Sequence, residues 1–499
     1  MSGEQTSVPL TASTLVGLDE TIAVPTYDRE QLVPSIVHIG VGGFHRAHLA
    51  AYVHNLCQAG RHDWSIVGAG VLASDGAMAE ALHAQDRLYS LITRDADTTT
   101  VEVIGSIVDY VHAAAEPDTL AGRIADPRTQ LVSLTVTEGG YPVDDATGAY
   151  LHRPPAAGDR SAFGVLAHGL AERRRAGHGA LTVVSCDNVV GNGDTARTAT
   201  LGEADRIDTD LSRWIDETVA FPNSMVDRIT PSTTDDDRSW LAATHGLVDR
   251  WPVITEPFSH WVIEDRFAGR RPPLEDVGVL VTSDVEPYEL MKLRLLNAGH
   301  SCLAYLAALL DIETVDAAVA DDHLRRYLVG FHDREAKPVM PPVMGIDLDD
   351  YTAAVLHRFS NPRIKDQIAR LCLDGTAKFP KFLLPTIRAQ LAVGGPVALS
   401  SLALAGWCEY LNGATRSGRA IDLADDPLLD VAVEHARGSQ RDPRAFLTFD
   451  AVFERDLAND DAFATAFSRA LNLIRERGVR SAIDAAFEEV VRQDDRSGD

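Results

Sequence analysis

Short apolar runs alternate with amphipathic stretches along the first half of the chain. Residues 35–40 (SIVHIG), 64–70 (WSIVGAG), 130–136 (QLVSLTV) and 181–186 (LTVVSC) are rich in valine and isoleucine and are bounded by turn residues, which is typical of buried strands. The stretches 46–59, 166–176 and 195–219 between them repeat their apolar positions at helical spacing. Because strands alternate with helices, the pattern predicts a doubly wound α/β fold with a parallel sheet.

The pattern changes near residue 286. Long amphipathic stretches follow at 287–310, 351–373, 396–411 and 462–477, with almost no strand signal between them. Pro287 suits the first turn of a helix, where its missing N–H costs no hydrogen bond. The length of 499 residues also exceeds the usual size of one hydrophobic core. We therefore expect an α/β domain at 1–285 and a mainly α-helical domain at 286–499.

A glycine-rich turn directly follows the first predicted strand. It consists of Gly40, Val41, Gly42, Gly43 and Phe44, and a helical pattern begins two residues later. A strand, a tight glycine turn and a helix N-terminus together form the Rossmann-type arrangement that receives the pyrophosphate of a dinucleotide. His45 stands where the third glycine of that fingerprint is expected, so the match by spacing is incomplete.

Asp75 lies five residues beyond the end of the second predicted strand. An acidic side chain at this position accepts hydrogen bonds from the ribose hydroxyls of NAD and repels the extra phosphate of NADP. The sequence therefore favours NAD as the cofactor. An equally open interpretation is that Asp75 caps the helix that begins at Gly76.

The stretch 287–300 (PYELMKLRLLNAGH) carries polar groups on a largely apolar helix. At about 100° per residue, Glu289, His300 and Asn297 lie at about 60°, 80° and 140° from Lys292. Buried polar groups need partners or a chemical role. Taken singly, a solvent-seeking lysine, a hydrogen-bonded core histidine and a loop-binding asparagine explain them. Taken together at a domain boundary, they indicate a site.

Lys292 is the candidate proton-transfer group for oxidation of an alcohol. The chain has only five lysines, and a lysine amine can be tuned to accept a proton, whereas arginine stays charged. Burial favours the neutral amine, and asparagine N–H groups stabilise a developing alkoxide. Asn188 follows the strand at 181–186, at the sheet edge where ligands of this fold bind, so we expect it to join Asn297 around the oxyanion. Asn188 is also consistent with an ordinary turn residue.

Composition excludes several other functions. The formal net charge of −27 opposes binding to nucleic acid or to anionic membranes. The five cysteines contain no CxxC pair, which argues against disulfides and a zinc–thiolate site and favours a reducing cytoplasm. The N-terminal sequence carries no basic residue ahead of a hydrophobic run, and no stretch approaches the roughly 18 apolar residues of a membrane span. We expect no export and no membrane anchor.

Several motifs resemble one known family. They are GVGGFHRAH (40–48), LTVTEGGY (134–141), SCDNVVGNG (185–193), MVDRITP (225–231), WVIEDRF (261–267), YELMKLRLLNAGH (288–300) and DGTAKFPKF (374–382). In this order they resemble the long-chain mannitol dehydrogenases, a family that also contains arabinitol dehydrogenases and the fructuronate and tagaturonate reductases. The runs DNVVGNG and DRITPSTTDDD are most similar to mannitol 2-dehydrogenases.

The resemblance implies an NAD-dependent, metal-free enzyme that interconverts D-mannitol and D-fructose. It implies that Lys292 is the general acid/base, that Asn188 and Asn297 are the oxyanion donors, and that His300 orients the substrate. In the same register, Arg370 and Lys378 are expected to contact the distal hydroxyls of the polyol. The GVGGFH turn, which fits the general fingerprint poorly, is the form that this family has.

Other interpretations remain open on the sequence alone. Fructuronate reductases share most of these motifs and need a cation for the C1 carboxylate, a role that Arg370 or Lys378 can also fill. A decarboxylating sugar-acid dehydrogenase and a cofactor-binding sensor without turnover are further alternatives. We expect a small polyol or ketose as the partner and a monomer or small homo-oligomer.

Overall fold

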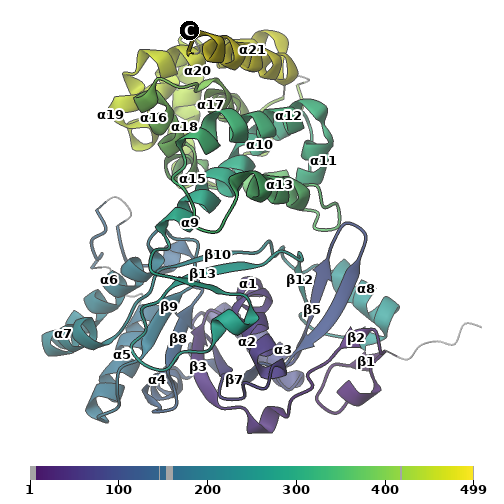
Figure 1. Ribbon diagram of the computed structural model, residues 1–499, viewed down its shortest axis with the longest axis vertical. Helices are drawn as coiled ribbons and strands as arrows, with labels where there is room; N and C mark the ends of the chain where they lie inside the picture. The colour runs from purple at the N-terminus through teal and green to yellow at the C-terminus, as the bar shows by residue number, and fades with distance from the viewer. Residues whose placement is uncertain (1–6, 145–146, 153–160, 416–417, 498–499) are drawn as a thin grey trace, which may run out of the picture. The chain divides into compact units, whose positions relative to one another are not determined.

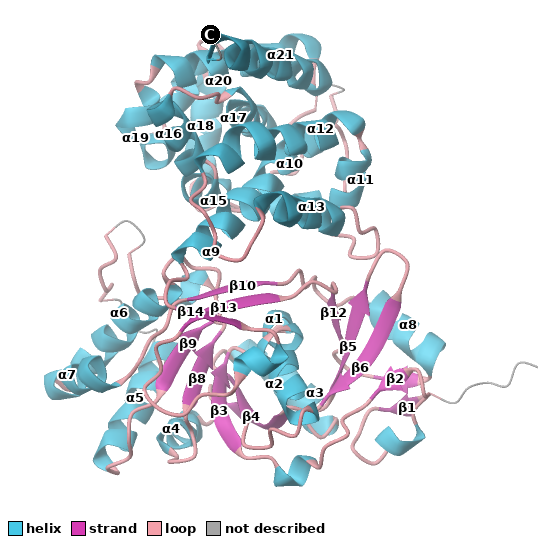
Figure 2. Cartoon of the chain, in the orientation of Figure 1, coloured by secondary structure: helices cyan, strands magenta, loops and turns pink. Residues whose placement is uncertain are grey.

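The chain divides between Glu286 and Pro287 into an α/β unit and a helical unit (Figure 1). The computed structural model describes residues 7–144, 147–152, 161–415 and 418–497. In these ranges the strands lie in the first unit, while the second unit is built from helices and loops (Figure 2). The predicted fold class, a Rossmann-type parallel sheet followed by a helical domain, is therefore confirmed.

The α/β unit is organised around a five-stranded sheet with the order β7-β4-β3-β8-β9, in which neighbouring strands are parallel. Its strands are β3 (Pro34–Ile39), β4 (Ser65–Gly70), β7 (Ile107–His112), β8 (Leu131–Leu134) and β9 (Thr182–Ser185). The chain builds the sheet outward from β3 in one direction and then returns to add β8 and β9 on the other side. The strand order thus reverses between β3 and β8, where doubly wound sheets bind their ligands.

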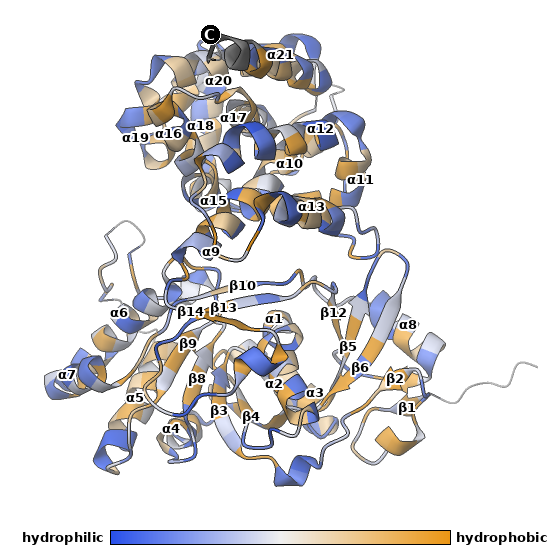
Figure 3. Ribbon diagram, viewed as in Figure 1, coloured by the Kyte–Doolittle hydropathy of each residue, from blue (hydrophilic) through white to orange (hydrophobic). Residues whose placement is uncertain are grey.

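Alternate residues of these strands enter two separate cores. Ile36, Ile66 and Leu131 belong to one apolar cluster, whereas their chain neighbours Val37, Val67 and Val132 belong to another. The strands are therefore apolar on both faces and read as continuous hydrophobic runs, as expected for a parallel sheet covered on both sides. Figure 3 shows this hydrophobic colouring along β8.

Helices of the α/β unit supply the two covering layers. The first cluster takes its helical residues mainly from α2, and the second mainly from α4, α5 and α6. The helices are α1 (Gly43–Ala47), α2 (Leu49–Gln58), α3 (Gly76–Ala84), α4 (Pro117–Ala125), α5 (Ala162–Arg175), α6 (Asn192–Asp205), α7 (Thr209–Thr218) and α8 (Asp235–His245).

Two of the predicted helices in this unit are interrupted. The stretch 195–219 is split into α6 and α7 because Asp208 adopts an extended backbone and its side chain caps α7 by accepting a hydrogen bond from the Asp210 N–H. The stretch 46–59 is split into α1 and α2 at His48, whose φ of −114° and ψ of −93° are not helical. Periodicity alone did not reveal either break.

Smaller sheets flank the central one, and the alternation pattern did not predict them. They are β12-β5-β6-β2, β10-β13-β14 and β1-β11, with antiparallel pairing of β5 with β6 and of β10 with β13. Their strands are β1 (Val8–Pro9), β2 (Ile22–Ala23), β5 (Tyr89–Arg94), β6 (Thr99–Ile104), β10 (Ser224–Asp227), β11 (Leu247–Val248), β12 (Val253–Thr255), β13 (His260–Glu264) and β14 (Leu280–Thr282).

The helical unit is centred on α17 (Ala398–Tyr410), in which every residue except Glu409 is buried. A helix that is apolar on all sides belongs in a core, and α17 packs against α10, α20 and α21. The other helices are α9 (Glu286–Met291), α10 (Ala298–Leu309), α11 (Val315–Ala320), α12 (Asp322–Gly330), α13 (Leu348–Phe359), α14 (Ile368–Leu371), α15 (Gly375–Phe382), α16 (Leu384–Val393), α18 (Leu429–Gly438), α19 (Asp450–Ala458), α20 (Asp461–Arg477) and α21 (Val479–Ser497).

The predicted helix at 351–373 is wrong over its second half. Helix α13 ends at Phe359, and a short helix, α14, begins only at Ile368. Pro362 explains the break, because the residue before a proline disfavours helical backbone angles. No helix in the described part of the chain is both long enough and apolar enough to cross a membrane.

Candidate active site

The glycine turn after β3 has the shape that a bound pyrophosphate requires. Gly40 has a φ of 98°, and a Cβ there would lie 2.1 Å from the Thr135 carbonyl oxygen, so only glycine fits. At Gly42, the nearest atom to an added Cβ is 3.9 Å away, which leaves open space over the backbone. Gly43 and Phe44 begin α1, and the first N–H groups of a helix have no acceptor within it. These residues fit a dinucleotide.

His45 replaces the third glycine of the fingerprint by stacking on His38 of β3. The two ring centroids are 3.4 Å apart with an interplanar angle of 13°, and both side chains are fully buried. His38 is fixed by its Nδ1 contact with Ser133 Oγ at 2.8 Å and its Nε2 contact with Thr135 Oγ1 at 2.9 Å. Burial lowers the pKa of His38 to about 3, so the ring stays neutral. The buried, stacked rings therefore fill the place where the fingerprint has a glycine without a side chain.

Asp75 lies beyond the end of β4 and does not cap α3. Its carboxylate Oδ2 instead accepts a hydrogen bond from the Leu72 N–H at 2.9 Å, and no side-chain hydrogen bond caps α3. The Asp75 side chain thus does not cap α3 itself, but it closes the start of the 3-10 turn Ala73–Asp75 that leads into α3. A Cβ on Gly70 would lie 2.4 Å from the Asp75 Cβ, so the glycine at the end of β4 makes room for this side chain. The partly exposed carboxylate remains a candidate for binding ribose hydroxyls.

Asn188 is exposed just beyond the end of β9, and its buried neighbour Asp187 fixes the local structure. The Asp187 carboxylate accepts hydrogen bonds from the Val136 N–H at 3.1 Å, the Thr137 N–H at 2.8 Å and the Tyr141 hydroxyl at 2.7 Å. It thereby ties the turn after β8 to the end of β9. We did not single out Asp187 from the sequence, although an acidic residue directly after a buried strand was the available signal.

Thr137 is held in a backbone conformation that favours glycine. Its φ is 63° and its ψ is 164°, a combination that costs a β-branched residue about 1–3 kcal/mol. The Asp187 hydrogen bond to its N–H stabilises this conformation. Strain of this kind is characteristic of ligand-binding turns, and this turn follows β8, at the point where the strand order reverses.

Lys292 lies on a continuous helix composed of α9, a π-helical segment at Lys292–Asn297 and α10. Its side chain is only 8% exposed, whereas Asn297 and His300 are half-buried. The His300 ring stacks on Phe359 of α13, with centroids 4.0 Å apart and an interplanar angle of 16°. The helix thus holds the three predicted catalytic residues of this unit, Lys292, Asn297 and His300, within nine consecutive residues.

Two hydrogen bonds to one nearby stretch of chain hold this helix. The Tyr288 hydroxyl donates to the Met344 carbonyl oxygen at 2.8 Å, and Arg294 Nη1 donates to the Val339 carbonyl oxygen at 3.2 Å. Both acceptors belong to the proline-rich stretch between α12 and α13. Hydrogen bonds to that stretch restrict rotation of the helix that carries Lys292.

The two predicted substrate-binding cations have different environments. Arg370 on α14 forms a bidentate ion pair with Asp366, with N–O distances of 2.8 and 2.6 Å, and its side chain is 54% exposed. Lys378 on α15 donates from Nζ to the Leu371 carbonyl oxygen at 3.3 Å. Helix α15 packs against the π-helical segment and α14 packs against α10. The helical unit therefore brings the elements of both cations against the helix of Lys292.

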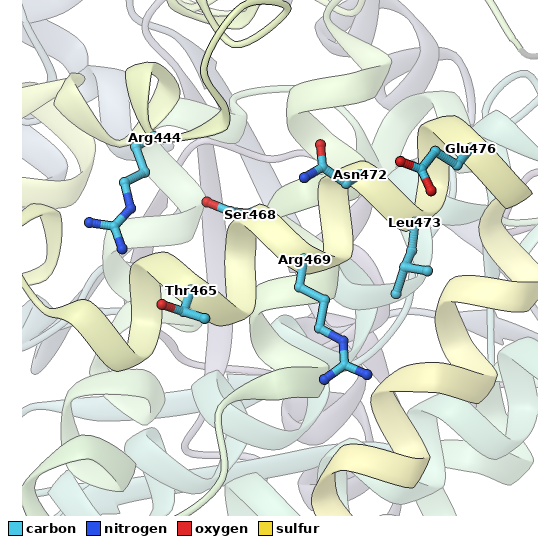
Figure 4. A pocket seen from close by; sticks show the side chains of 7 residues that line it. All are labelled: Arg444, Thr465, Ser468, Arg469, Asn472, Leu473 and Glu476. Atoms are coloured by element: carbon cyan, nitrogen blue, oxygen red, sulfur yellow. The ribbon is translucent and has the colours of Figure 1, made fainter.

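The described surface also has a hollow away from these residues, and its arginine side chains are already paired. A hollow of about 520 Å³ is lined by residues of α20 together with Arg444 (Figure 4). Its two arginines are already paired, Arg444 with Asp461 and Arg469 with Glu489. Among the described residues, no group of three or more His, Cys, Asp or Glu side chains has a geometry that could hold a metal ion.

Two family models match most of the chain. The mannitol dehydrogenase Rossmann domain matches residues 34–276, and the mannitol dehydrogenase C-terminal domain matches residues 284–475. A mannitol 2-dehydrogenase from Cereibacter sphaeroides is 43% identical over 93% of this chain and 99% of its own length. A mannitol 2-dehydrogenase from Phaeosphaeria nodorum is 41% identical over 93% of this chain and 83% of its own length.

Two solved structures are similar over nearly the whole chain. The Pseudomonas fluorescens mannitol 2-dehydrogenase, determined as a ternary complex with NAD and D-mannitol, has a TM-score of 0.87 at 38% identity and covers 96% of this chain and 100% of its own. A D-sorbitol dehydrogenase in substrate-free form has a TM-score of 0.88 at 36% identity and covers 95% of this chain and 100% of its own.

Proposed function

Because this chain belongs to the mannitol dehydrogenase family and is an oxidoreductase acting on the CH–OH group of polyols, we propose that its reaction is the NAD-dependent interconversion of D-mannitol and D-fructose. The observation that carries the proposal is the buried amine of Lys292 on the same helix as Asn297 and His300. A buried amine with adjacent carboxamide and imidazole groups suits proton transfer at a hydroxyl whose carbon loses a hydride.

In the oxidative direction, the Lys292 amine accepts the proton of the C2 hydroxyl. The N–H groups of Asn188 and Asn297 donate hydrogen bonds to the C2 oxygen and stabilise its negative charge as the C–H bond breaks. His300, held flat against Phe359, donates or accepts a hydrogen bond at the substrate and fixes its orientation. When bound, NAD accepts the hydride from C2. Ketose reduction is the reverse, with the Lys292 ammonium returning the proton.

The cofactor is proposed to bind along the glycine turn and Asp75. The open space over Gly42 supports an approach of the pyrophosphate to the backbone, and the first N–H groups of α1 are its donors. The Asp75 carboxylate binds the adenosine ribose, and its negative charge disfavours the 2′-phosphate of NADP.

The ion pair of Arg370 supports a neutral polyol over a sugar acid. A C1 carboxylate needs an unbalanced cation, but the Arg370 guanidinium already shares its charge with Asp366 through two hydrogen bonds. A hydroxyl group needs only one donor or acceptor, and a half-exposed guanidinium retains N–H groups for this purpose. Arg370 and Lys378 are thus proposed to bind the distal hydroxyls.

The direct test is a spectrophotometric panel with NADH and, in parallel, NADPH. Fructose, fructuronate, tagaturonate and xylulose are compared by kcat/KM. We expect fructose with NADH to exceed each of the other pairs by at least about tenfold, because discrimination of one polar contact is worth that much. A preference for fructuronate would assign the chain to the uronate reductases, and carbon dioxide release from a sugar acid would assign a decarboxylating reaction.

A further inference from the structure

The helical unit contains two π-helical segments that pack against each other. One is Lys292–Asn297, which carries the proposed catalytic groups, and the other is Phe331–Ala336, which follows α12. Segments of this kind are rare in proteins and concentrate at functional sites, because the wider turn is less stable than an α-helical one. Each needs contacts that keep it from relaxing to an α-helix.

The first π segment changes which side chains share a face. Its hydrogen bonds run from residue i+5 to residue i, as in the bond from the Ala298 N–H to the Leu293 carbonyl oxygen. Lys292 and Asn297 are the first and last residues of this segment and are five positions apart. In an α-helix they would be separated by about 140° around the axis. In the π segment, residue i+5 takes the place over residue i that i+4 has in an α-helix, so the amine and the carboxamide come to one face.

His332 of the second π segment contacts the first at its centre. Its Nε2 lies 2.9 Å from the Leu295 carbonyl oxygen, and the side chain is 2% exposed. Because a carbonyl oxygen only accepts, Nε2 carries the proton and donates. Burial lowers the pKa of His332 to about 4, so the neutral ring keeps this arrangement at neutral pH.

Gly299 provides the space that this contact needs. A Cβ on Gly299 would lie 3.2 Å from His332 Nε2, closer than a side chain usually approaches. The imidazole therefore sits directly against the backbone between the π segment and α10. No larger residue at 299 leaves the ring in the same position.

The second π segment is itself fixed to the core. The carboxylate of Glu335 accepts hydrogen bonds from the Leu399 N–H at 2.7 Å and the Ser400 N–H at 2.8 Å, at the start of α17. Glu335 is fully buried, and its backbone carbonyl accepts a hydrogen bond from the Gln390 side chain at 2.5 Å. His332 thus projects from a segment with little freedom to move.

We propose that His332 is a positioning residue that holds the segment Lys292–Asn297 in its π register, so that the amine of Lys292 and the carboxamide of Asn297 act on the same oxygen. The catalytic half of this inference rests on the proposed function, whereas the structural half concerns the backbone alone. His332 does not itself contact the reacting atoms. It acts by occupying the Leu295 carbonyl oxygen, which an α-helical register would use for a backbone N–H.

The test compares three variants by kinetics. His332→Phe keeps a flat ring but removes the donor, and His332→Gln restores a side-chain N–H near the position of Nε2. Tyr327→Phe is the matched control, because it removes another buried donor to a carbonyl oxygen, that of Leu399, from the same part of the helical unit. We expect His332→Phe to lower kcat by about 10- to 100-fold, since a misplacement of about 1 Å costs that much. His332→Gln should recover most of the loss, and Tyr327→Phe should stay near wild type.

NADH affinity and a crystal structure of His332→Phe distinguish a positioning role of His332 from general damage to the fold. NADH affinity, measured by fluorescence titration, should not change in His332→Phe, and kcat should fall more than KM rises. A crystal structure of this variant should show the Ala298 N–H bonded to the Arg294 carbonyl oxygen, which is the α-helical register. Wild-type kcat in His332→Phe, or a low kcat with the Ala298–Leu293 bond retained, would overturn the inference.

A substitution at Gly299 tests the same inference if His332→Phe does not fold. Gly299→Ala adds one methyl group that would lie 3.2 Å from both His332 Nε2 and Leu328 Cδ1, in a helix that favours alanine, so it presses on the imidazole without burying a polar group. It should lower kcat several-fold and lengthen the contact of His332 with Leu295, and an unchanged kcat would count against the inference. If the wild-type enzyme turns over no polyol, the proposed function fails, but the helical register in these variants still decides whether His332 holds the π segment.

Discussion

Two glycines of the same turn should respond to alanine in opposite ways. Gly40 has a φ of 98°, and its added Cβ would lie 2.1 Å from the Thr135 carbonyl oxygen. Gly42 has a φ of −102° and a ψ of −169°, which any residue adopts, and its added Cβ would have no neighbour closer than 3.9 Å. The fold therefore requires glycine at position 40. At position 42 the protein itself leaves room for a larger residue, and only a bound ligand would require glycine.

The expected magnitudes follow from these distances. Gly40→Ala combines backbone strain of about 1–2 kcal/mol with an overlap worth about 1–3 kcal/mol, so unfolding should become easier by about 2–5 kcal/mol. Gly42→Ala should change the unfolding free energy by no more than about 0.5 kcal/mol. Its Cβ occupies the space where phosphate oxygens approach the backbone, and loss of one charge-assisted hydrogen bond costs about 1.5–3 kcal/mol. The NADH affinity should fall by about 10- to 100-fold.

The assay pairs a denaturant melt with a titration of NADH fluorescence on each variant. Gly42→Ala should melt like wild type and bind NADH poorly, whereas Gly40→Ala should melt early. Wild-type NADH affinity in a folded Gly42→Ala variant would refute the reasoning, because the pyrophosphate would then lie away from this turn. A large loss of stability in Gly42→Ala would show that the turn is packed more tightly than the structure describes.

Three further predictions follow from the described residues. Lys292→Ala should lower kcat by about 10²- to 10⁴-fold, and small alkylamines should partly restore it. Lys292→Met fills the space of the lysine side chain, so alkylamines should not restore its activity. Intact turnover in either variant would contradict the proposed role of Lys292. Asp75→Ala should weaken NADH binding and improve NADPH binding, and unchanged affinities for both would remove Asp75 from the cofactor site. Acid should destabilise the protein between about pH 6.5 and 5, because buried histidines with lowered pKa values take up protons only when the chain unfolds. These histidines are His38, His45 and His332. Burial raises the pKa of Glu335 to about 7, which opposes the effect of the histidines. Calorimetry should therefore show the unfolding free energy falling by about 1–3 kcal/mol for each pH unit of acidification. An unfolding free energy that rises as the pH falls through this window would contradict the assignment.

Much of the α/β unit could be predicted because its strands are buried on both faces. Continuous apolar runs such as 35–40 and 181–186 need no partner to be recognised, and they correspond to β3 and β9. The hairpin of β5 and β6 has a mixed pattern with exposed positions, as at Thr100, and was not predicted. The helix breaks at Asp208 and His48 were not predicted either, because a single residue with non-helical backbone angles does not disturb hydrophobic periodicity.

The candidate site was predictable in its residue types and less so in its geometry. The sequence shows that Lys292 and Asn297 share a helix, but the α-helical angle of about 140° places them on different faces. Asp187 and His332 were not identified at all, since each acts on a backbone group of a segment distant in sequence. Contacts between a side chain and a remote backbone group leave no local pattern.

Two of the places where general rules misjudged the local structure carry residues of the proposed cofactor turn and of the proposed catalytic helix. The glycine fingerprint does not allow for His45, yet this side chain is fully buried and stacked on His38. The helical wheel separates Lys292 from Asn297, yet the π segment that begins and ends at these two residues removes the separation. Each exception is maintained by one buried, neutral histidine from another segment, His38 in the first case and His332 in the second. A carboxamide five residues from the proposed catalytic amine lies over it only in a π register, whereas a carboxamide four residues away lies over it in an α-helix. Insertion of one residue between Lys292 and Asn297 should therefore abolish turnover while NADH still binds, and deletion of one residue should be tolerated better than the insertion because it leaves the α-helical i+4 spacing.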